Sequence, residues 1–278
     1  MKLQFALPIL FLICNLAAHG DASVNRTPSD EVDVGGRTIR IPPPVGFERV
    51  DGLDPKLDRM VEGMLPESNR YLARFNPAKT NTIDEGRNFS AQVLRQLENR
   101  EIGTRGFGEI KSKMKRQLES LEKTIREEVA KVSGRAEKSF QDTVGADAAL
   151  KISDTAVLGT FDDSPDSLGF TLALKLATKA GGVSSSGKGV VAGMIVPVNG
   201  RMIYLYANAD YKSEADRKWA ERAVKAWRDE VVAANPRLEG PSMRPSFLKG
   251  VGRSTMIGAI VGGLAGLLAW LFRKKKKS

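Results

Sequence analysis

The chain contains one cysteine, Cys14, and one histidine, His19, and both lie near its N-terminus. Zinc sites of the usual kinds, and the Ser-His-Asp and Cys-His nucleophile systems, need these side chains. Those kinds of catalysis are therefore excluded for the remainder of the chain. The sequence identifies no catalytic residue, no cofactor and no metal ligand. A pair of carboxylates that meet only in the folded protein cannot be recognised from the sequence.

Residues 182–189 (GVSSSGKG) nearly match a phosphate-binding P-loop. Gly189, however, stands where a Ser or Thr would hold magnesium. Ser184 to Ser186 beside Lys188 could also form the Ser-Lys pair of a hydrolase. A lysine in such a Gly/Ser segment is solvated, so burial does not lower its pKa. We interpret these residues as a flexible loop between two strands.

The densest acidic cluster is the run of residues 162–167 (DDSPDS). Oxygen ligands at this density could hold a calcium ion. The run matches no calcium-binding loop, however, and Asp, Ser and Pro are ordinary turn residues. We therefore interpret the run as a turn.

Gly258, Gly262 and Gly266 recur every four residues in an apolar segment. They form two overlapping G-x-x-x-G steps, which place the glycines on one face of a helix and let two helices approach closely in lipid. The pattern predicts a homo-oligomer formed through this segment. The alternative is an anchor that is merely rich in glycine, as membrane helices often are.

These glycines lie in a predicted membrane-spanning helix at residues 254–272. The stretch from Thr255 to Phe272 has no charged residue, and a helix of about 27 Å would cross a slightly thin hydrocarbon core. The cations that follow orient it, because the positive-inside rule keeps them in the cytoplasm beside the lipid headgroups. The alternative is a buried core helix, which would have to accept consecutive cations at one end. The orienting cations are Arg273, Lys274, Lys275, Lys276 and Lys277.

The N-terminus predicts export. Residues 1–22 contain Lys2, then an apolar stretch, then small residues, which is the pattern of a cleaved signal peptide. An uncleaved anchor is the alternative, but the apolar stretch falls short of the ~20 residues needed to span a membrane. A sizeable exported domain without disulfides is typical of a bacterial periplasm.

The formal net charge of +10 comes mostly from the two ends of the chain. All 33 acidic residues lie within residues 21–250, and 7 of the 43 Lys and Arg residues lie outside that range. The remaining part is only weakly basic, so it has no electrostatic footprint for nucleic acid.

One domain is predicted at residues 37–234. A flexible leader at 23–36 precedes it, and a stalk rich in Pro and Gly at 235–253 links it to the membrane helix and to the basic tail at 273–278. Strand patterns are expected at 37–41, 46–50, 69–75, 149–161, 168–178, 190–198 and 201–207. Residues 88–97 suit either a strand or a helix, and we favour a strand.

Apolar residues recur every three or four positions from Arg105 to Gln141, which predicts a long amphipathic helix. A continuous helix of this length would be on the order of 50 Å long, more than a compact domain can cover. We therefore expect it to break near residues 133–134 or to project as a spacer.

The C-terminal half of the domain contains a hairpin and a helix. Asn199-Gly200 is typical of a type I′ turn, and Ser213 begins a near capping box. Trp219 and Trp227 lie on one face of the helix that follows, where we expect core packing rather than ligand stacking. Together these elements predict an α+β fold, with an antiparallel or mixed sheet covered by helices, one long amphipathic helix and a C-terminal transmembrane helix.

Three short motifs resemble uncharacterised bacterial exported, membrane-anchored proteins of unknown function. They are residues 41–47 (IPPPVGF), 69–73 (NRYLA) and 200–206 (GRMIYLY). The resemblance covers about residues 37–234 and implies no activity and no functional residue.

The leading functional hypothesis is a non-enzymatic, membrane-tethered periplasmic domain that binds a partner or assists envelope assembly. Its expected partners are membrane lipid, a second copy of itself and another envelope protein, with no nucleic acid. The expected location is the bacterial inner membrane, with the domain in the periplasm and the tail in the cytoplasm. A hydrolase that uses carboxylates or a Ser-Lys pair and a structural coiled-coil spacer are the alternatives.

Overall fold

One large antiparallel sheet organises the molecule. The computed structural model describes residues 30–79, 86–118, 122–241, 256–260 and 262–263. In this part of the chain seven strands pair in the order β3-β4-β5-β9-β8-β7-β6, and neighbours are always antiparallel. The strands are β3 Phe47–Arg49, β4 Asn69–Pro77, β5 Asn88–Leu94, β6 Ala149–Asp162, β7 Leu168–Ala180, β8 Val183–Val198 and β9 Arg201–Asp210.

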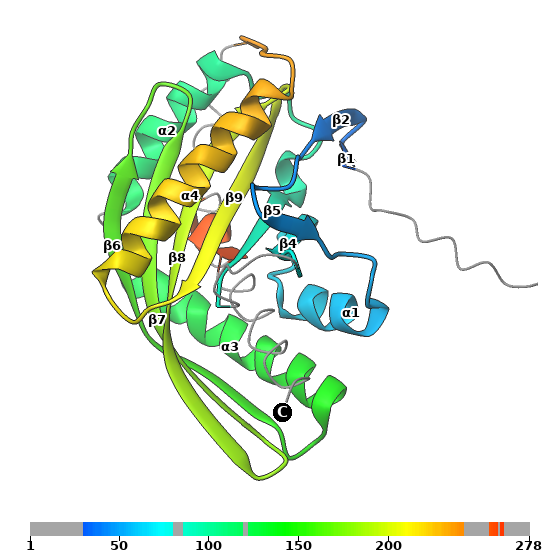
Figure 1. Ribbon diagram of the computed structural model, residues 1–278. Helices are drawn as coiled ribbons and strands as arrows, with labels where there is room; N and C mark the ends of the chain where they lie inside the picture. Colours follow the sequence, from blue (N-terminus) through cyan, green and yellow to red (C-terminus); the bar gives the residue numbers. More distant parts are fainter. Residues whose placement is uncertain (1–29, 80–85, 119–121, 242–255, 261, 264–278) are drawn as a thin grey trace, which may run out of the picture.

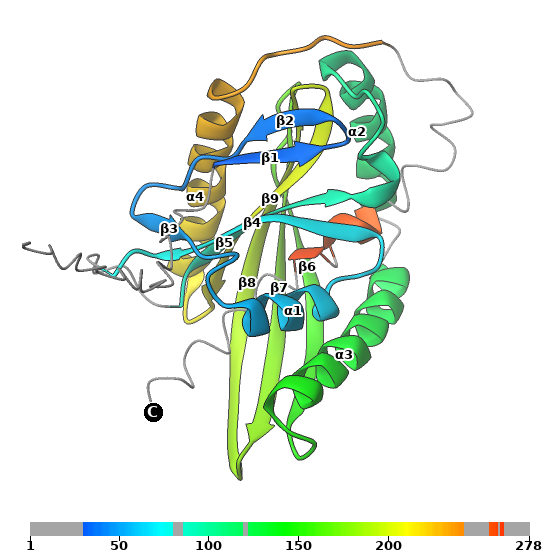
Figure 2. The ribbon, with the colours of Figure 1, turned by 90° about the vertical axis from the view of Figure 1, so that its right-hand side faces the viewer.

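Helices cover both faces of this sheet. Helix α4 (Glu214–Ala233) packs across β8 and β9 on one face, and the other face carries α1 (Pro55–Met64), α2 (Thr104–Leu118) and α3 (Glu122–Val144). Figure 1 shows α4 in front of the sheet, and the turned view in Figure 2 separates it from α2 and α3 on the far side. Alternation of side chains along the strands therefore supplies two cores, one per face.

A second, small sheet closes the α4 side. Strands β1 (Glu31–Val34) and β2 (Arg37–Arg40) form a hairpin, and Val34 and Ile39 contribute to the α4 core. Arg201 holds the hairpin, because its guanidinium donates to the carbonyl oxygens of Val34 at 2.9 Å and Gly35 at 2.6 Å. The first strand lies within the range predicted as a leader.

Several local predictions are confirmed. Asn199 and Gly200 both have positive φ, at 44° and 74°, and join β8 to β9. The side chain of Asp216 completes the capping box with Ser213 at the start of α4. Of the strand favoured at residues 88–97, residues 88–94 form β5, whereas Arg95–Leu97 form a short 3-10 helix.

Two helices, α2 and α3, are described within the range predicted as one long helix. Helix α2 ends at Leu118 and α3 begins at Glu122, and residues 133–134, where a break was expected, are helical within α3. Phe107, Ile110 and Met114 of α2 are buried against the sheet, and α3 lies beside β6 and α1. The apolar face of both helices is used within one molecule.

The prediction of a flexible loop at residues 182–189 is wrong. The turn is confined to Gly181 and Gly182, which have φ of 55° and 77°, and β8 already begins at Val183. Serine and glycine have low strand propensity, but pairing with β7 along thirteen registered positions extends the strand through them.

The prediction of a C-terminal membrane-spanning helix is also wrong. In the described part of the chain, no helix is both long enough and apolar enough to cross a membrane. Met256, Ala259 and Ile260 instead lie fully buried in the core on the α3 side of the sheet. The described part of the fold is therefore α+β without a membrane-spanning helix, and the inner-membrane location and single-pass topology inferred from that helix are overturned. Of the predicted helix, residues 254–255, 261 and 264–272 lie outside the described residues. The predicted signal peptide (1–22) and the cations at 273–277 lie outside the described residues.

Trp227 is the centre of the α4 core, and it should dominate the stability of that face. Its ring meets Phe75 and Phe89 edge to face, with centroids 5.4 and 5.2 Å away, and its Nε1 donates to the carbonyl oxygen of Pro42 at 2.8 Å. We expect Trp227→Ala to lower the free energy of unfolding by about 3–5 kcal/mol in urea denaturation.

Trp219 on the same helix is the matched control. It is only half-buried and stacks under the Arg87 guanidinium, 4.3 Å from the ring centroid. Trp219→Ala should cost about 1 kcal/mol. Equal losses for the two variants would contradict this assignment of the core.

Candidate functional site

Polar side chains gather where an antiparallel sheet normally buries apolar ones. On the α3 side of the sheet, six fully buried residues of β4, β5 and β9 form a continuous patch, which we call the polar strip. Cross-strand pairing places Asn88 beside Asn208 and Ser90 beside Tyr206, and Gln92 follows on the same face by two-residue alternation. The members of the polar strip are Asn69, Asn88, Ser90, Gln92, Tyr206 and Asn208.

Residues 256–263 lie on the polar strip. Their described members have helical backbone, and Figure 2 shows this short segment beside β4 and β5, between α2 and α3. Three side chains of the strip donate hydrogen bonds to its carbonyl oxygens. Asn69 Nδ2 reaches the oxygen of Gly258 at 2.9 Å, Tyr206 Oη that of Ala259 at 2.7 Å, and Gln92 Nε2 that of Gly262 at 2.8 Å.

The glycines of this segment are required by the closeness of that contact. A Cβ atom added to Gly258 would overlap the Leu94 side chain, and one added to Gly262 would overlap the amides of Asn69 and Gln92. A Cβ atom on Gly263 would lie 2.8 Å from Val191. The G-x-x-x-G spacing thus brings backbone against side chains of the sheet. Gly266, the third glycine of the predicted pattern, lies outside the described residues.

The polar strip extends beyond these three hydrogen bonds. Asn208 Nδ2 donates to Asn88 Oδ1 at 2.8 Å, and this leaves Asn88 Nδ2, Asn208 Oδ1 and the Ser90 hydroxyl buried with no hydrogen-bond partner among the described residues. A buried donor or acceptor without a partner costs about 1–3 kcal/mol. Such groups are retained mainly where they meet a ligand or water.

The side chains of the polar strip are uncharged amides and hydroxyl groups. Burial, together with the neighbouring Tyr204 and Tyr71, raises the pKa of Tyr206 well above its ordinary value, so its hydroxyl stays protonated and donates. Burial likewise raises the pKa of Tyr71 to about 12. Amide and phenol groups recognise backbone carbonyls but do not transfer protons near neutral pH.

The acidic run at residues 162–167 is a turn, as expected, and basic side chains from both helical layers bind it. Lys111 and Lys115 of α2 pair with Asp163, with Lys111 Nζ 3.0 Å away. From α4, Lys225 Nζ lies 3.0 Å from Asp162. Arg228, also on α4, donates to the Ser167 hydroxyl at 3.0 Å. The turn therefore joins α2 to α4 around the end of the sheet.

The Ser-Lys pairing lies on the surface. Ser184, Ser186 and Lys188 are exposed along β8, so the lysine is not the buried, desolvated base that a Ser-Lys hydrolase needs. Among the described residues, no group of three or more His, Cys, Asp or Glu could hold a metal ion.

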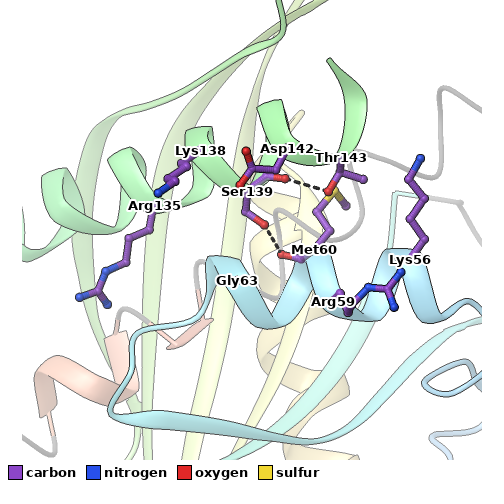
Figure 3. A pocket seen from close by; sticks show the side chains of 9 residues that line it. All are labelled: Lys56, Arg59, Met60, Gly63, Arg135, Lys138, Ser139, Asp142 and Thr143. Atoms are coloured by element: carbon purple, nitrogen blue, oxygen red, sulfur yellow. Dashed lines mark hydrogen bonds between the residues drawn. The ribbon is translucent and has the colours of Figure 1, made fainter. Parts of the chain in front are cut away.

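A separate cleft of about 460 Å³ lies between α1 and α3. The helices meet closely there, because Gly63 leaves room for Ser139, whose hydroxyl donates to the Met60 carbonyl at 2.9 Å. Figure 3 shows Arg59 and Arg135 of this cleft pointing in opposite directions. Its basic side chains do not converge on one position, so we regard it as a packing seam.

Sequence reasoning missed Asn69, Gln92 and Tyr206. The sequence did contain a signal for the polar strip. In residues 88–94 (NFSAQVL), polar residues occupy every second position up to Gln92 and alternate with apolar ones. Their side chains meet residues 256–263 only through contacts between residues 189, 170 and 53 positions apart in the sequence.

Comparisons with known proteins give little further information. No protein family and no curated protein matches the chain. Among solved structures, it is similar to a mutant of the protein Mog1, with 11% identity over 80% of this chain and 99% of that chain and a TM-score of 0.31. At this TM-score the likeness supports no conclusion about fold or function. The resemblance to bacterial exported proteins stays a prediction.

Asp162 should make the free energy of unfolding depend on pH in the acidic range. Burial raises its pKa, but hydrogen bonds from Ser167, Lys225 and Ser164 outweigh burial and lower the pKa from 3.8 to about 2. The charged form therefore stabilises the fold above pH 3.8, and this contribution is lost as the pH falls through about 2. We expect Asp162→Asn to cost about 2 kcal/mol at neutral pH and progressively less below pH 4.

Denaturation at several pH values measures this difference. Asp142→Asn, at an exposed position of α3, serves as control and should leave stability within ~0.5 kcal/mol of the wild type. A loss for Asp162→Asn that stays constant down to pH 2 would argue against a charged Asp162.

Gly262→Ala should detach residues 256–263 from the polar strip. The added methyl group has no space beside Asn69 and Gln92, so amide hydrogen exchange of 256–263 should accelerate at least tenfold while the sheet remains protected. Gly134→Ala is the matched control, because this helical glycine has no atom within 4 Å of an added Cβ. That variant should leave the exchange of 256–263 unchanged. Unaltered exchange in Gly262→Ala would refute the contact.

Proposed function

We propose that this protein is a non-enzymatic binding module whose polar strip takes a short, apolar, glycine-rich helical segment. Residues 256–263 are the occupant supplied by the chain itself. The observation that carries the proposal is the set of three hydrogen bonds from Asn69, Gln92 and Tyr206 to carbonyl oxygens of one segment.

Recognition of backbone carbonyls selects the shape of the occupant. A backbone carbonyl oxygen has two lone pairs, so a carbonyl within a helical segment can also accept a hydrogen bond from a side chain. Side-chain donors on a rigid sheet satisfy those carbonyls, and only residues without a Cβ atom allow the approach at Gly258 and Gly262. The site is therefore specific for small residues four positions apart.

Apolar contacts supply affinity beside these polar ones. Met256, Ala259 and Ile260 are fully buried with Leu94 and Val191, and a buried Met or Ile side chain contributes roughly 1.5–3 kcal/mol. Because the occupant belongs to the same chain, its effective concentration is high. A segment of another protein with the same character would have to compete with it.

The chemical groups of the polar strip support binding rather than hydrolysis. The described residues of the polar strip carry amides and hydroxyl groups, with the pKa of Tyr206 raised. These groups suit binding, whereas general acid-base catalysis needs a pKa near the working pH.

A disulfide placed between the strip and its occupant tests the proposal. In a Cys14→Ser background, which removes the single native cysteine, Leu94→Cys and Gly258→Cys would place two thiols within bonding range. The Leu94 methyl groups that a Cβ on Gly258 would overlap are removed by the Leu94→Cys substitution itself. We expect mild oxidation to cross-link most chains internally, measured as monomer of altered mobility on a non-reducing gel.

The control pairs Leu94→Cys with Val183→Cys, an exposed position at the far tip of β8. It should give no internal cross-link. Addition of an excess of a peptide with the sequence of residues 253–264 before oxidation should reduce cross-linking of the test pair. Failure of the test pair to cross-link internally would reject the proposed occupancy.

A further inference from the structure

The strands β7 and β8 extend beyond their neighbour β9. Strand β9 ends at Asp210, which pairs with Gly189, whereas β8 begins at Val183. In the part of the chain that the structure describes, residues 183–187 pair only with β7. Figures 1 and 2 show these strands as an arm that projects past α4.

The backbone of this arm presents an open edge. Tyr211 N donates to the Lys188 carbonyl oxygen at 2.9 Å, so Lys188 directs its backbone groups toward the β9 side. Strand geometry repeats every two residues, so Ser186 and Ser184 direct their N–H and C=O groups to the same side, beyond the end of β9. Exposed edges of this kind accept an additional strand.

One face of the arm is basic. Cross-strand register aligns Lys175 with Lys188 and Lys179 with Ser184, and Lys151 of β6 lies on the same face beside Ala177. All four lysines are exposed, and Lys175 forms a long ion pair with Asp154 at 3.9 Å. The opposite face holds Leu174 and Leu176, which are buried on the α3 side.

We propose that the open edge at residues 183–187 binds an extended acidic peptide as an added strand. Its backbone pairs with Ser184 and Ser186, and its alternate side chains lie on the face of the four lysines, where carboxylates are favoured. A second copy of this chain is disfavoured as occupant, because edge-to-edge pairing would bring two lysine faces together. The small side chains of residues 184–187 (SSSG) leave backbone pairing and charge as the sources of affinity.

Three labelled peptides separate strand addition from simple charge attraction in binding to the full-length protein, measured by fluorescence anisotropy. (Thr-Glu)5 should bind, and (Thr-Lys)5 should not. (Pro-Glu)5 keeps the carboxylates but has no amide donors at its prolines, so it should bind at least tenfold more weakly than (Thr-Glu)5. Hydrogen exchange should show new protection of the amides of Ser184 and Ser186.

Variants of the arm complete the test. Lys175→Glu/Lys188→Glu should weaken (Thr-Glu)5 binding at least tenfold, whereas Lys218→Glu on the exposed side of α4 should change it less than twofold. Ser186→Pro removes only a donor that faces the open edge and should also weaken binding at least tenfold. Equal binding of (Pro-Glu)5 and (Thr-Glu)5, or protection that falls elsewhere than on β8, would overturn the proposal.

Discussion

Burial of polar groups on one half of a sheet face is the constraint on which this structure depends. Asn69, Gln92 and Tyr206 are inaccessible to water, and each would destabilise the fold if its donor had no partner. The carbonyl oxygens of residues 256–263 supply those partners. A segment that is apolar enough to suggest a membrane helix therefore completes the core of the protein.

The remainder of the fold makes that face rigid. Helix α4 covers the opposite face through Trp227 and its aromatic neighbours, and the acidic turn at residues 162–167 ties α4 to α2 by ion pairs. Helices α2 and α3 fill the apolar half of the inner face. The polar strip is thus presented by strands whose positions are fixed from both sides, as a selective binding surface requires.

Local patterns in the sequence were sufficient for much of this architecture. The Asn199-Gly200 hairpin, the capping box at Ser213 and the strand at residues 88–94 depend on neighbours in the chain, and all are present. Hydropathy alone could not distinguish hydrocarbon from a protein core as the environment of Met256 and Ile260, because both are apolar. The polar strip was missed since its residues become one site only when β4, β5 and β9 pair.

The most direct measurement of the central claim is an NMR spectrum of the full-length protein with selectively labelled glutamine and glycine. The hydrogen bond from Gln92 to Gly262 predicts nuclear Overhauser contacts between the side-chain amide protons of Gln92 and the backbone of Gly262, together with slow exchange of those amide protons with water. Gln92 amide protons that exchange as fast as those of an exposed glutamine, with no contact to Gly262, would contradict it.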